Sequence, residues 1–208
     1  MTIGRYFAQY PTCEFLAGRS EMRDVSGTKI FWRVENLPRS LAQLLEYPLG
    51  RYLAQPSVFF RRCVLDRVGP LDEQLHYAMD LDLWLRVAEH YQIETLPQTL
   101  SWMRIHEGAK TIHSNVHVNS EVESIIARYR SKVAGSKYRT IVRATRRNKA
   151  RACLTPGFNV PCSAKQMRAA ILEAFNHDKS IVFTRDWLKM VLRLVLPLKL
   201  RRFIFVRV

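Results

Sequence analysis

The charged residues of this chain are distributed very unevenly, and this division limits how the chain can fold. Residues 1–124 carry 13 basic and 15 acidic side chains, whereas residues 125–208 carry 20 basic and 3 acidic ones. The net charge of +15 therefore belongs to the C-terminal part. A near-neutral segment can close around a core, while a densely basic one repels itself and attracts phosphate. The pattern predicts a folded body followed by a basic segment whose partners are lipid headgroups or nucleic acid.

Hydrophobic spacing predicts a mixed α/β body. The most regular helix is expected at 81–90, because Leu81, Trp84, Leu85 and Ala88 recur at helical intervals. Two strands, at 93–96 and 100–105, are expected on either side of Pro97. The other elements expected in the body are helices at 2–10, 40–46 and 63–68 and strands at 13–17, 29–34 and 58–61. After residue 111 the pattern is helical, with helices expected at 118–130, 139–151, 164–175 and 186–196.

Cysteine spacing and hydropathy bear on the compartment. The four cysteines contain no C-x-x-C pair, and their spacing is typical of neither a zinc site nor a disulfide framework, so reduced thiols are expected. The N-terminus has no apolar region of the signal-peptide type. No stretch reaches the roughly 18 uninterrupted apolar residues of a membrane-spanning helix. We expect a cytoplasmic protein, peripheral at the inner face of the cell membrane.

Two aspartates lie where a loop meets the expected helix at 81–90. Asp80 stands at its start and Asp82 two residues further on. A carboxylate in this place faces the positive end of the helix dipole, which favours its ionised form. The alternative is structural: Asp80 is the N-cap of the helix and Asp82 a charge of its first turn. The Asp-x-Asp pattern alone does not distinguish a catalytic from a structural role.

Four motifs follow one another at compact spacing around these aspartates: QPSVFFRR, VGPLDE, YAMDLDLWLR and MRIHEGAKT, all within residues 55–111. In this order they resemble the acceptor-side half of family 2 glycosyltransferases, which have the GT-A fold. The resemblance implies a partial, Rossmann-like α/β GT-A domain over residues 1–115, followed by a basic helical extension over 116–208. It also implies that Asp80 is the general base of an inverting transfer. Met79 stands where the family often has Glu.

The resemblance implies roles for seven further residues. Arg104, His106 and Lys110 match the family's mobile loop and are expected to help stabilise the leaving diphosphate. Gln55, Ser57, Asp82 and Trp84 are expected at the acceptor pocket. A structural alternative remains open for each of them. Arg104 and Lys110 could lie at a solvated strand end, and His106 could be a hydrogen-bonded loop histidine. Gln55 and Ser57 could form a turn into a strand, Asp82 could be a first-turn charge, and most of Trp84 could pack in the core.

The same resemblance implies a nucleotide-sugar donor, a saccharide or lipid-linked acceptor, and a divalent cation, Mg²⁺ or Mn²⁺. The family holds that cation through an Asp-x-Asp motif in an N-terminal nucleotide-binding half. No Asp-x-Asp stands upstream of Gln55. We therefore expect a fragment or truncated member of an enzyme of cell-envelope polysaccharide or glycolipid synthesis, without the main cation ligands.

The basic C-terminal part suggests a membrane partner. Its last expected helix carries an apolar stripe of Leu188, Val191, Leu192 and Val195 beside Lys189 and Arg193, a combination suited to an anionic membrane surface. Alternatively, the stripe packs on the body. Nucleic acid is the other phosphate-bearing partner, but the cations at 143–151 lack interleaved aromatic residues for base stacking. A non-catalytic protein that binds membrane or nucleic acid is the alternative to the enzyme.

Overall fold

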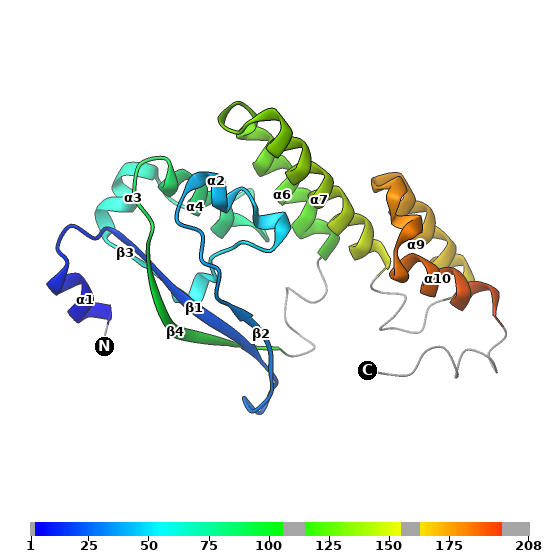
Figure 1. Ribbon diagram of the computed structural model, residues 1–208, viewed down its shortest axis with the longest axis horizontal. Coiled ribbons are helices and arrows are strands. Elements are labelled where there is room, and N and C mark those ends of the chain that lie inside the picture. The colour runs from blue at the N-terminus through cyan, green and yellow to red at the C-terminus, as the bar shows by residue number, and fades with distance from the viewer. Residues whose placement is uncertain (1–2, 106–114, 155–162, 197–208) are drawn as a thin grey trace.

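The computed structural model describes residues 3–105, 115–154 and 163–196, which form a mixed α/β structure (Figure 1). Its sheet has four strands: β1 (Phe15–Arg23), β2 (Ile30–Val34), β3 (Val58–Phe60) and β4 (Glu94–Arg104). The α-helices are α1 (Ile3–Gln9), α2 (Leu41–Leu44), α3 (Arg62–Val68), α4 (Met79–Ala88), α6 (Asn115–Arg128), α7 (Gly135–Leu154), α9 (Ala164–His177) and α10 (Arg185–Val195). Short 3-10 helices are η1 (Tyr47–Leu49), η2 (Gln55–Ser57), η3 (Arg130–Lys132) and η4 (Lys179–Phe183). Each predicted helix corresponds to one of these helices, within a few residues at its ends.

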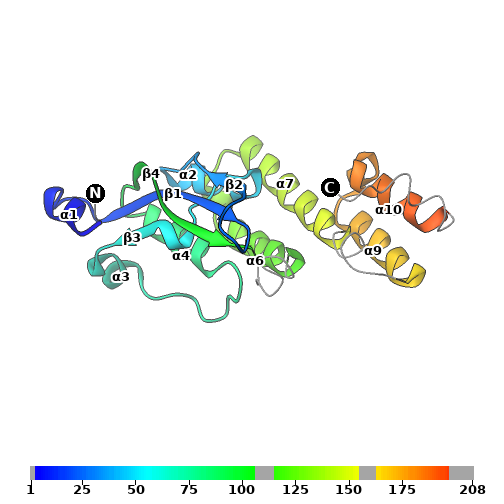
Figure 2. The ribbon, with the colours of Figure 1, turned by 90° about the horizontal axis from the view of Figure 1, so that it is seen from below.

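The molecule is elongated, with its two ends connected by α7. The sheet and helices α1 to α4 form one end, and α9 and α10 form the other (Figures 1 and 2). Helix α7 lies beside α6 near the body and beside α9 at its far end. The long basic helix therefore belongs to both parts of the molecule.

Strand β1 is the centre of the sheet. It pairs antiparallel with β2 and β3 and parallel with β4. Phe15, Leu16 and Ala17 at its start are fully buried. The strand predicted at 13–17 in fact continues to Arg23, because β4 on one side and β2 on the other supply hydrogen-bonding partners along its whole length.

One strand, β4, replaces the two that were predicted around Pro97. Gly18 pairs with Leu96 and Arg19 with Thr99, so Pro97 and Gln98 form an irregularity in the ladder. A proline is tolerated there because the interrupted ladder does not require its missing N–H. A Cβ atom on Gly18 would lie 2.3 Å from Cδ1 of Leu100, so any larger residue here would require the Leu100 side chain to move.

Helix α4 packs against the sheet through its apolar face. Leu85 and Val87 are fully buried, and the Trp84 ring lies 5.3 Å from Phe15 and 6.0 Å from Phe60, centroid to centroid. The helix begins at Met79, two residues earlier than predicted, with Ala78 at its N-cap. Asp80 is therefore the second residue of the helix and not its cap.

Helix α6 completes the core of this body, although its residues were assigned to the extension. Val122, Ile125, Ile126 and Tyr129 are buried in the same cluster as the residues of α4. That cluster extends to Ile141 in α7. The predicted boundary between residues 115 and 116 stays a prediction, but the body draws on side chains beyond it.

A second, smaller cluster holds the C-terminal helices together. Its buried members are Ala150, Cys153, Leu154, Met167, Ala174, Ile181 and Met190. Trp187 and Leu194 of α10 pack against it. The stripe predicted for this helix lies on another side: Leu188 is 56% and Val195 72% exposed. Over the described residues, none of the helices combines the length and apolar character needed to cross a membrane.

Candidate acidic site at the start of α4

Asp80 lies in the first turn of α4 and is half-buried. Its Oδ1 accepts a hydrogen bond of 2.8 Å from the backbone N–H of Leu81. Within residues 3–105, 115–154 and 163–196, no lysine, arginine or histidine forms an ion pair with it. The carboxylate is thus held in position while its charge has no cationic side chain beside it.

Burial raises the pKa of Asp80 above the ordinary range of an aspartate, and the Leu81 N–H acts in the opposite direction. The helix dipole, on which the sequence argument relied, favours the ionised form. Desolvation outweighs this effect in the folded chain. A raised pKa brings the carboxyl closer to the pH at which it can both accept and release a proton.

Tyr47 of η1 lies close to Asp80. Burial and the negative charge of Asp80 raise the pKa of this phenol to about 12, with a smaller effect of Tyr52. The Tyr52 ring lies 5.9 Å from that of Tyr47, centroid to centroid. The Tyr47 hydroxyl therefore keeps its proton at neutral pH, and the charge of Asp80 acts on it through space. No sequence pattern indicates this neighbour, since 33 positions separate the two residues.

Asp82 has a different environment although it is only two residues away. Its side chain is 2% exposed, and it forms ion pairs with Nε of Arg86 at 2.9 Å and with a guanidinium nitrogen of Arg128 at 2.7 Å. Arg86 also donates to the carbonyl groups of Val68 and Pro70 at the end of α3. Asp82 therefore joins α4, α6 and α3, and its oxygens do not face an open acceptor pocket as its predicted role requires.

Glu121 of α6 fixes the loop that leads into α4. Its carboxylate accepts hydrogen bonds from three consecutive backbone N–H groups, those of His76, Tyr77 and Ala78, at 2.8 to 2.9 Å. Although burial alone would raise the pKa of this carboxyl, the three donors hold it below its usual value. Glu121 thereby positions Asp80, two residues beyond Ala78. Sequence reasoning missed it, because a glutamate on an amphipathic helix carries no local signal of such a contact.

Ser57 and Gln55, both assigned to the acceptor pocket, have different environments in η2. Ser57 is fully buried and donates to the carbonyl oxygen of Arg19 at 3.0 Å, and its hydroxyl lies 2.6 Å from that of Ser101. Gln55 is exposed. Ser57 thus joins η2 to β1 and β4, and only Gln55 of this pair presents its side chain to solvent.

The remaining predicted residues lie in the core, at the end of β4, or outside the described residues. Trp84 is 5% exposed and packs in the core, and its indole nitrogen has no hydrogen-bond partner among the described residues. Arg104 is exposed at the end of β4, where its guanidinium lies 5.7 Å from the centre of the Trp102 ring. His106 and Lys110 lie outside the described residues.

The aspartates at the start of α4 do not form a cation site in this structure, because both oxygens of Asp82 are bound by arginines. Among the described residues, the only group with suitable ligand spacing is Cys153, Glu173 and His177, far along the chain in α7 and α9. Burial and the nearby Glu173 raise the pKa of the Cys153 thiol to about 11. The residues around Asp80 therefore do not fit the divalent cation that the resemblance implies.

No protein-family model matches the chain, nor does any curated protein or solved structure. The motifs around Asp80 and the geometry of its surroundings are therefore what indicates a function for this chain.

Proposed function

We propose that the chain is the acceptor-side part of an inverting family 2 glycosyltransferase with a GT-A fold. The observation that carries the proposal is the contrast within one motif: Asp82 is neutralised by two arginines, whereas Asp80 has no described cationic partner and a raised pKa. A catalytic base has to be held in place without being neutralised. Asp80 meets this requirement, and Glu121 is its positioning residue through the loop that leads into α4.

In the proposed reaction, a hydroxyl oxygen of the acceptor attacks the anomeric carbon of a nucleotide sugar. The new bond forms as the bond from that carbon to the diphosphate oxygen breaks. Asp80 accepts the proton of the attacking hydroxyl, which increases its nucleophilicity as the bond forms. Inversion follows because the hydroxyl attacks from the face opposite the leaving group.

The leaving diphosphate acquires negative charge, which basic side chains stabilise. Arg104 at the end of β4, with His106 and Lys110 after it, is proposed to serve this purpose. We assign no step to a divalent cation, because the described acidic residues near Asp80 do not offer a site for one. Gln55 remains the exposed candidate for contact with the acceptor.

The test is transfer or hydrolysis of a nucleotide sugar by the wild type and by Asp80→Asn. Loss of a general base lowers the rate by about 10²- to 10⁴-fold. Asp72→Asn is the matched control, since the Asp72 side chain lies in the loop before α4 and, among the described contacts, accepts only a local hydrogen bond from Gln74 N–H. Equal activity of Asp80→Asn and the wild type would remove Asp80 from the mechanism.

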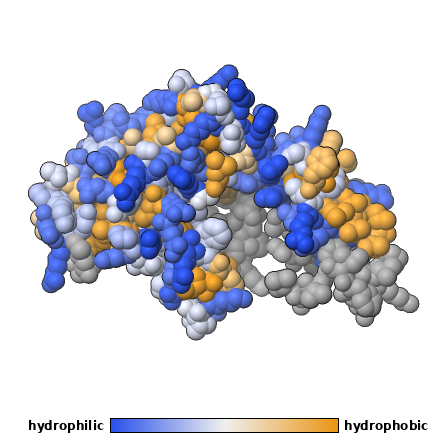
Figure 3. All heavy atoms as spheres, viewed as in Figure 1, coloured by the Kyte–Doolittle hydropathy of each residue, from blue (hydrophilic) through white to orange (hydrophobic). Residues whose placement is uncertain are grey.

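We propose peripheral membrane attachment through α10, in keeping with a role in cell-envelope polysaccharide or glycolipid synthesis. Leu188 and Val195 are exposed on this helix, and Phe183 just before it is 90% exposed. Figure 3 shows apolar surface gathered at the C-terminal end of the molecule. Lys189 and Arg193 lie on the same helix and suit anionic headgroups.

These features also favour the second candidate function, a non-catalytic protein that binds an anionic membrane. Sedimentation with phosphatidylglycerol vesicles, compared with duplex DNA binding at matched salt, separates lipid from nucleic acid as the partner. Vesicle binding together with complete absence of nucleotide-sugar turnover in the wild type would favour the second candidate. Tighter binding to the duplex than to vesicles would contradict both membrane proposals.

A further inference from the structure

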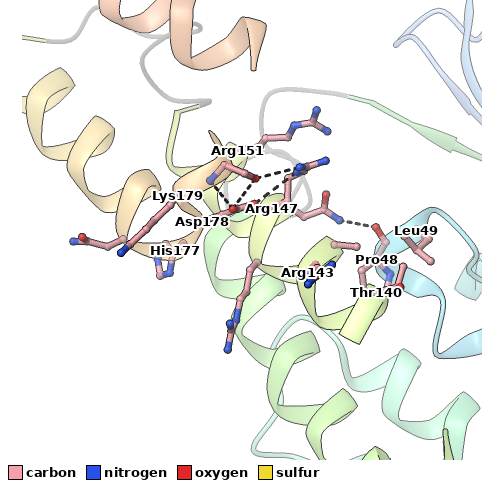
Figure 4. A pocket seen from close by; sticks show the side chains of 14 residues that line it. Pro48, Leu49, Thr140, Arg143, Arg147, Arg151, His177, Asp178 and Lys179 are labelled. Carbon is pink, nitrogen blue, oxygen red and sulfur yellow. Dashed lines mark hydrogen bonds and ion pairs between the residues drawn. The ribbon is translucent and has the colours of Figure 1, made fainter. Parts of the chain in front are cut away.

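A basic groove of about 860 Å³ lies between η1 of the body, helix α7 and the α9–η4 junction (Figure 4). Five cationic side chains line it against one carboxylate, that of Asp178. The cations are Arg143, Arg146, Arg147, Arg151 and Lys179. Pro48 and Leu49 supply its wall on the side of the body. None of the residues assigned to the transferase site lines this groove.

Hydrogen bonds between the two parts of the molecule hold the groove in shape. The Asn148 side chain of α7 donates to the carbonyl oxygen of Pro48 at 2.8 Å. At the other wall, Arg147 donates to the Ser180 hydroxyl at 3.1 Å and lies 3.6 Å from the Asp178 carboxylate. Asp178 in turn accepts from the backbone N–H and the hydroxyl of Ser180. The Arg147 guanidinium is therefore fixed in place within the groove.

The spacing of the arginines along α7 brings like charges together. Arg143, Arg147 and Arg151 recur every four residues and so lie on one face of the helix. Like charges at this spacing repel one another. A bound anion would remove that repulsion, and a concave surface concentrates the field at its centre.

Local acidic residues account for only part of this positive charge. Arg146 lies 3.8 Å from Glu123, and Arg151 lies 3.8 Å from Asp186. Arg143 and Lys179 have no ion-pair partner within the portions of the chain that the structure describes. Both are exposed to the groove's solvent. The positive charges of Arg143 and Lys179 therefore match a dianion, and a phosphate monoester is close to this state at neutral pH.

We propose that this groove binds a phosphate monoester or diphosphate group. Arg143 and Lys179 supply the unpaired charges, and Arg147 supplies a guanidinium already fixed by Asp178 and Ser180. Guanidinium groups suit this ligand because their paired N–H donors match phosphate oxygens. The site differs from membrane adsorption by α10, since it recognises one phosphate group within a formed groove. Its existence does not depend on the chemistry at Asp80.

Binding of inorganic pyrophosphate to the full chain, measured by titration calorimetry, tests the proposal. The double variant Arg143→Ala/Lys179→Ala should lose affinity about tenfold or more, because two charge-assisted contacts are removed. The control Arg130→Ala/Lys165→Ala removes the same charges from exposed positions outside the groove lining. It should change the affinity by less than about twofold beyond the general effect of salt. All four side chains are exposed, so folding should be retained, as checked by circular dichroism.

Vesicles identify the source of the phosphate. Phosphatidylcholine vesicles containing phosphatidic acid, a phosphate monoester lipid, should displace pyrophosphate if the ligand is a lipid headgroup, and should not if it is a soluble phosphate compound. Either result, with the groove variant impaired and the control intact, supports the site. Equal losses in the two double variants, or no pyrophosphate binding by the wild type at millimolar concentration, would overturn it. The proposal would also be overturned if duplex DNA displaced pyrophosphate and bound both double variants as tightly as it binds the wild type.

Discussion

The body and the C-terminal helices have apolar clusters of different size. Among the described residues, one cluster of eighteen buried side chains joins the sheet to α4, α6 and the start of α7, and the cluster among α7, α9, η4 and α10 contains seven. Large apolar residues are exposed in both parts, for example Trp32 and Trp102 on the body and Phe183 and Val195 beside the smaller cluster. The larger cluster includes Leu81, next to Asp80, whereas on α10 exposed apolar side chains lie close to basic ones.

The charged groups differ in the same way. In the body, Asp82 is 2% exposed and pairs with two arginines. In the C-terminal helices, Asp186 pairs with Arg151 at 3.8 Å while about half of each side chain stays in solvent. Buried pairs fix the relative positions of helices, while exposed ones contribute little to stability. The buried pairs of Asp82 organise the candidate site, and the exposed pairs leave cations accessible in the groove.

Truncation of a core residue should show the largest difference between the two parts. Ile125→Ala removes a fully buried side chain of α6 and should lower the free energy of unfolding by about 2–5 kcal/mol. Met190→Ala, equally buried, should cost less because its smaller cluster can relax more easily around the cavity. Urea unfolding followed by circular dichroism and by tryptophan fluorescence measures both. Equal losses in a single shared transition would show that the two clusters form one cooperative unit.

Removal of the buried carboxylate should have the next largest effect. Asp82→Ala loses two charge-assisted contacts and should destabilise the chain by about 1.5–3 kcal/mol. Asp186→Ala should cost less than about 1 kcal/mol, since its pair is solvated. Thermal unfolding at neutral pH compares the two variants. A similar cost for both would contradict the distinction between buried and exposed pairs.

Asp80→Asn should stabilise the chain, whereas Asp82→Ala should destabilise it. The pKa of Asp80 is raised in the folded state, so the folded chain binds more protons than the unfolded chain between the ordinary aspartate pKa of about 3.9 and the raised value. Stability is therefore lost as the pH rises through that window. The variant should gain about 0.5–2 kcal/mol at neutral pH.

The pH dependence provides the control for this prediction. Below the ordinary pKa both folded and unfolded chains carry a protonated Asp80, so the advantage of Asp80→Asn should vanish there. Unfolding in urea across a pH series measures the difference. A variant less stable than the wild type at neutral pH would show that the carboxylate acts mainly as a charge stabilising the first turn of α4.

Replacement of an exposed apolar residue should have the smallest effect on stability. Leu188→Ser should change the free energy of unfolding by no more than about 0.5 kcal/mol, yet lower partitioning to phosphatidylglycerol vesicles by roughly tenfold. Val25→Ser, at a similarly exposed position in the β1–β2 turn, is the control from the body and should leave vesicle binding unchanged. Equal vesicle binding by Leu188→Ser and the wild type would exclude α10 as the contact.

Local patterns in the sequence were sufficient to predict most helices and strands, but not where the strands end or whether two of them form one continuous strand. The apolar spacing of Leu81, Trp84 and Leu85 predicted α4 because helical geometry places these residues on one face. Pro97 indicated a break between two strands, yet β4 passes through it with an irregular register. The pairing partner β1 decides this outcome, and a proline carries no information about a strand more than seventy residues away.

The sequence by itself determined the periodicity of the helices, the separation of near-neutral and basic parts, and the motifs around Asp80. Each of these is a property of neighbouring residues or of composition. The tertiary structure alone decided that Arg128 neutralises Asp82, that Glu121 holds the loop before α4, and that Tyr47 lies beside Asp80. Electrostatic and hydrogen-bond contacts act over a few ångströms in space, and only folding brings such distant residues within that range.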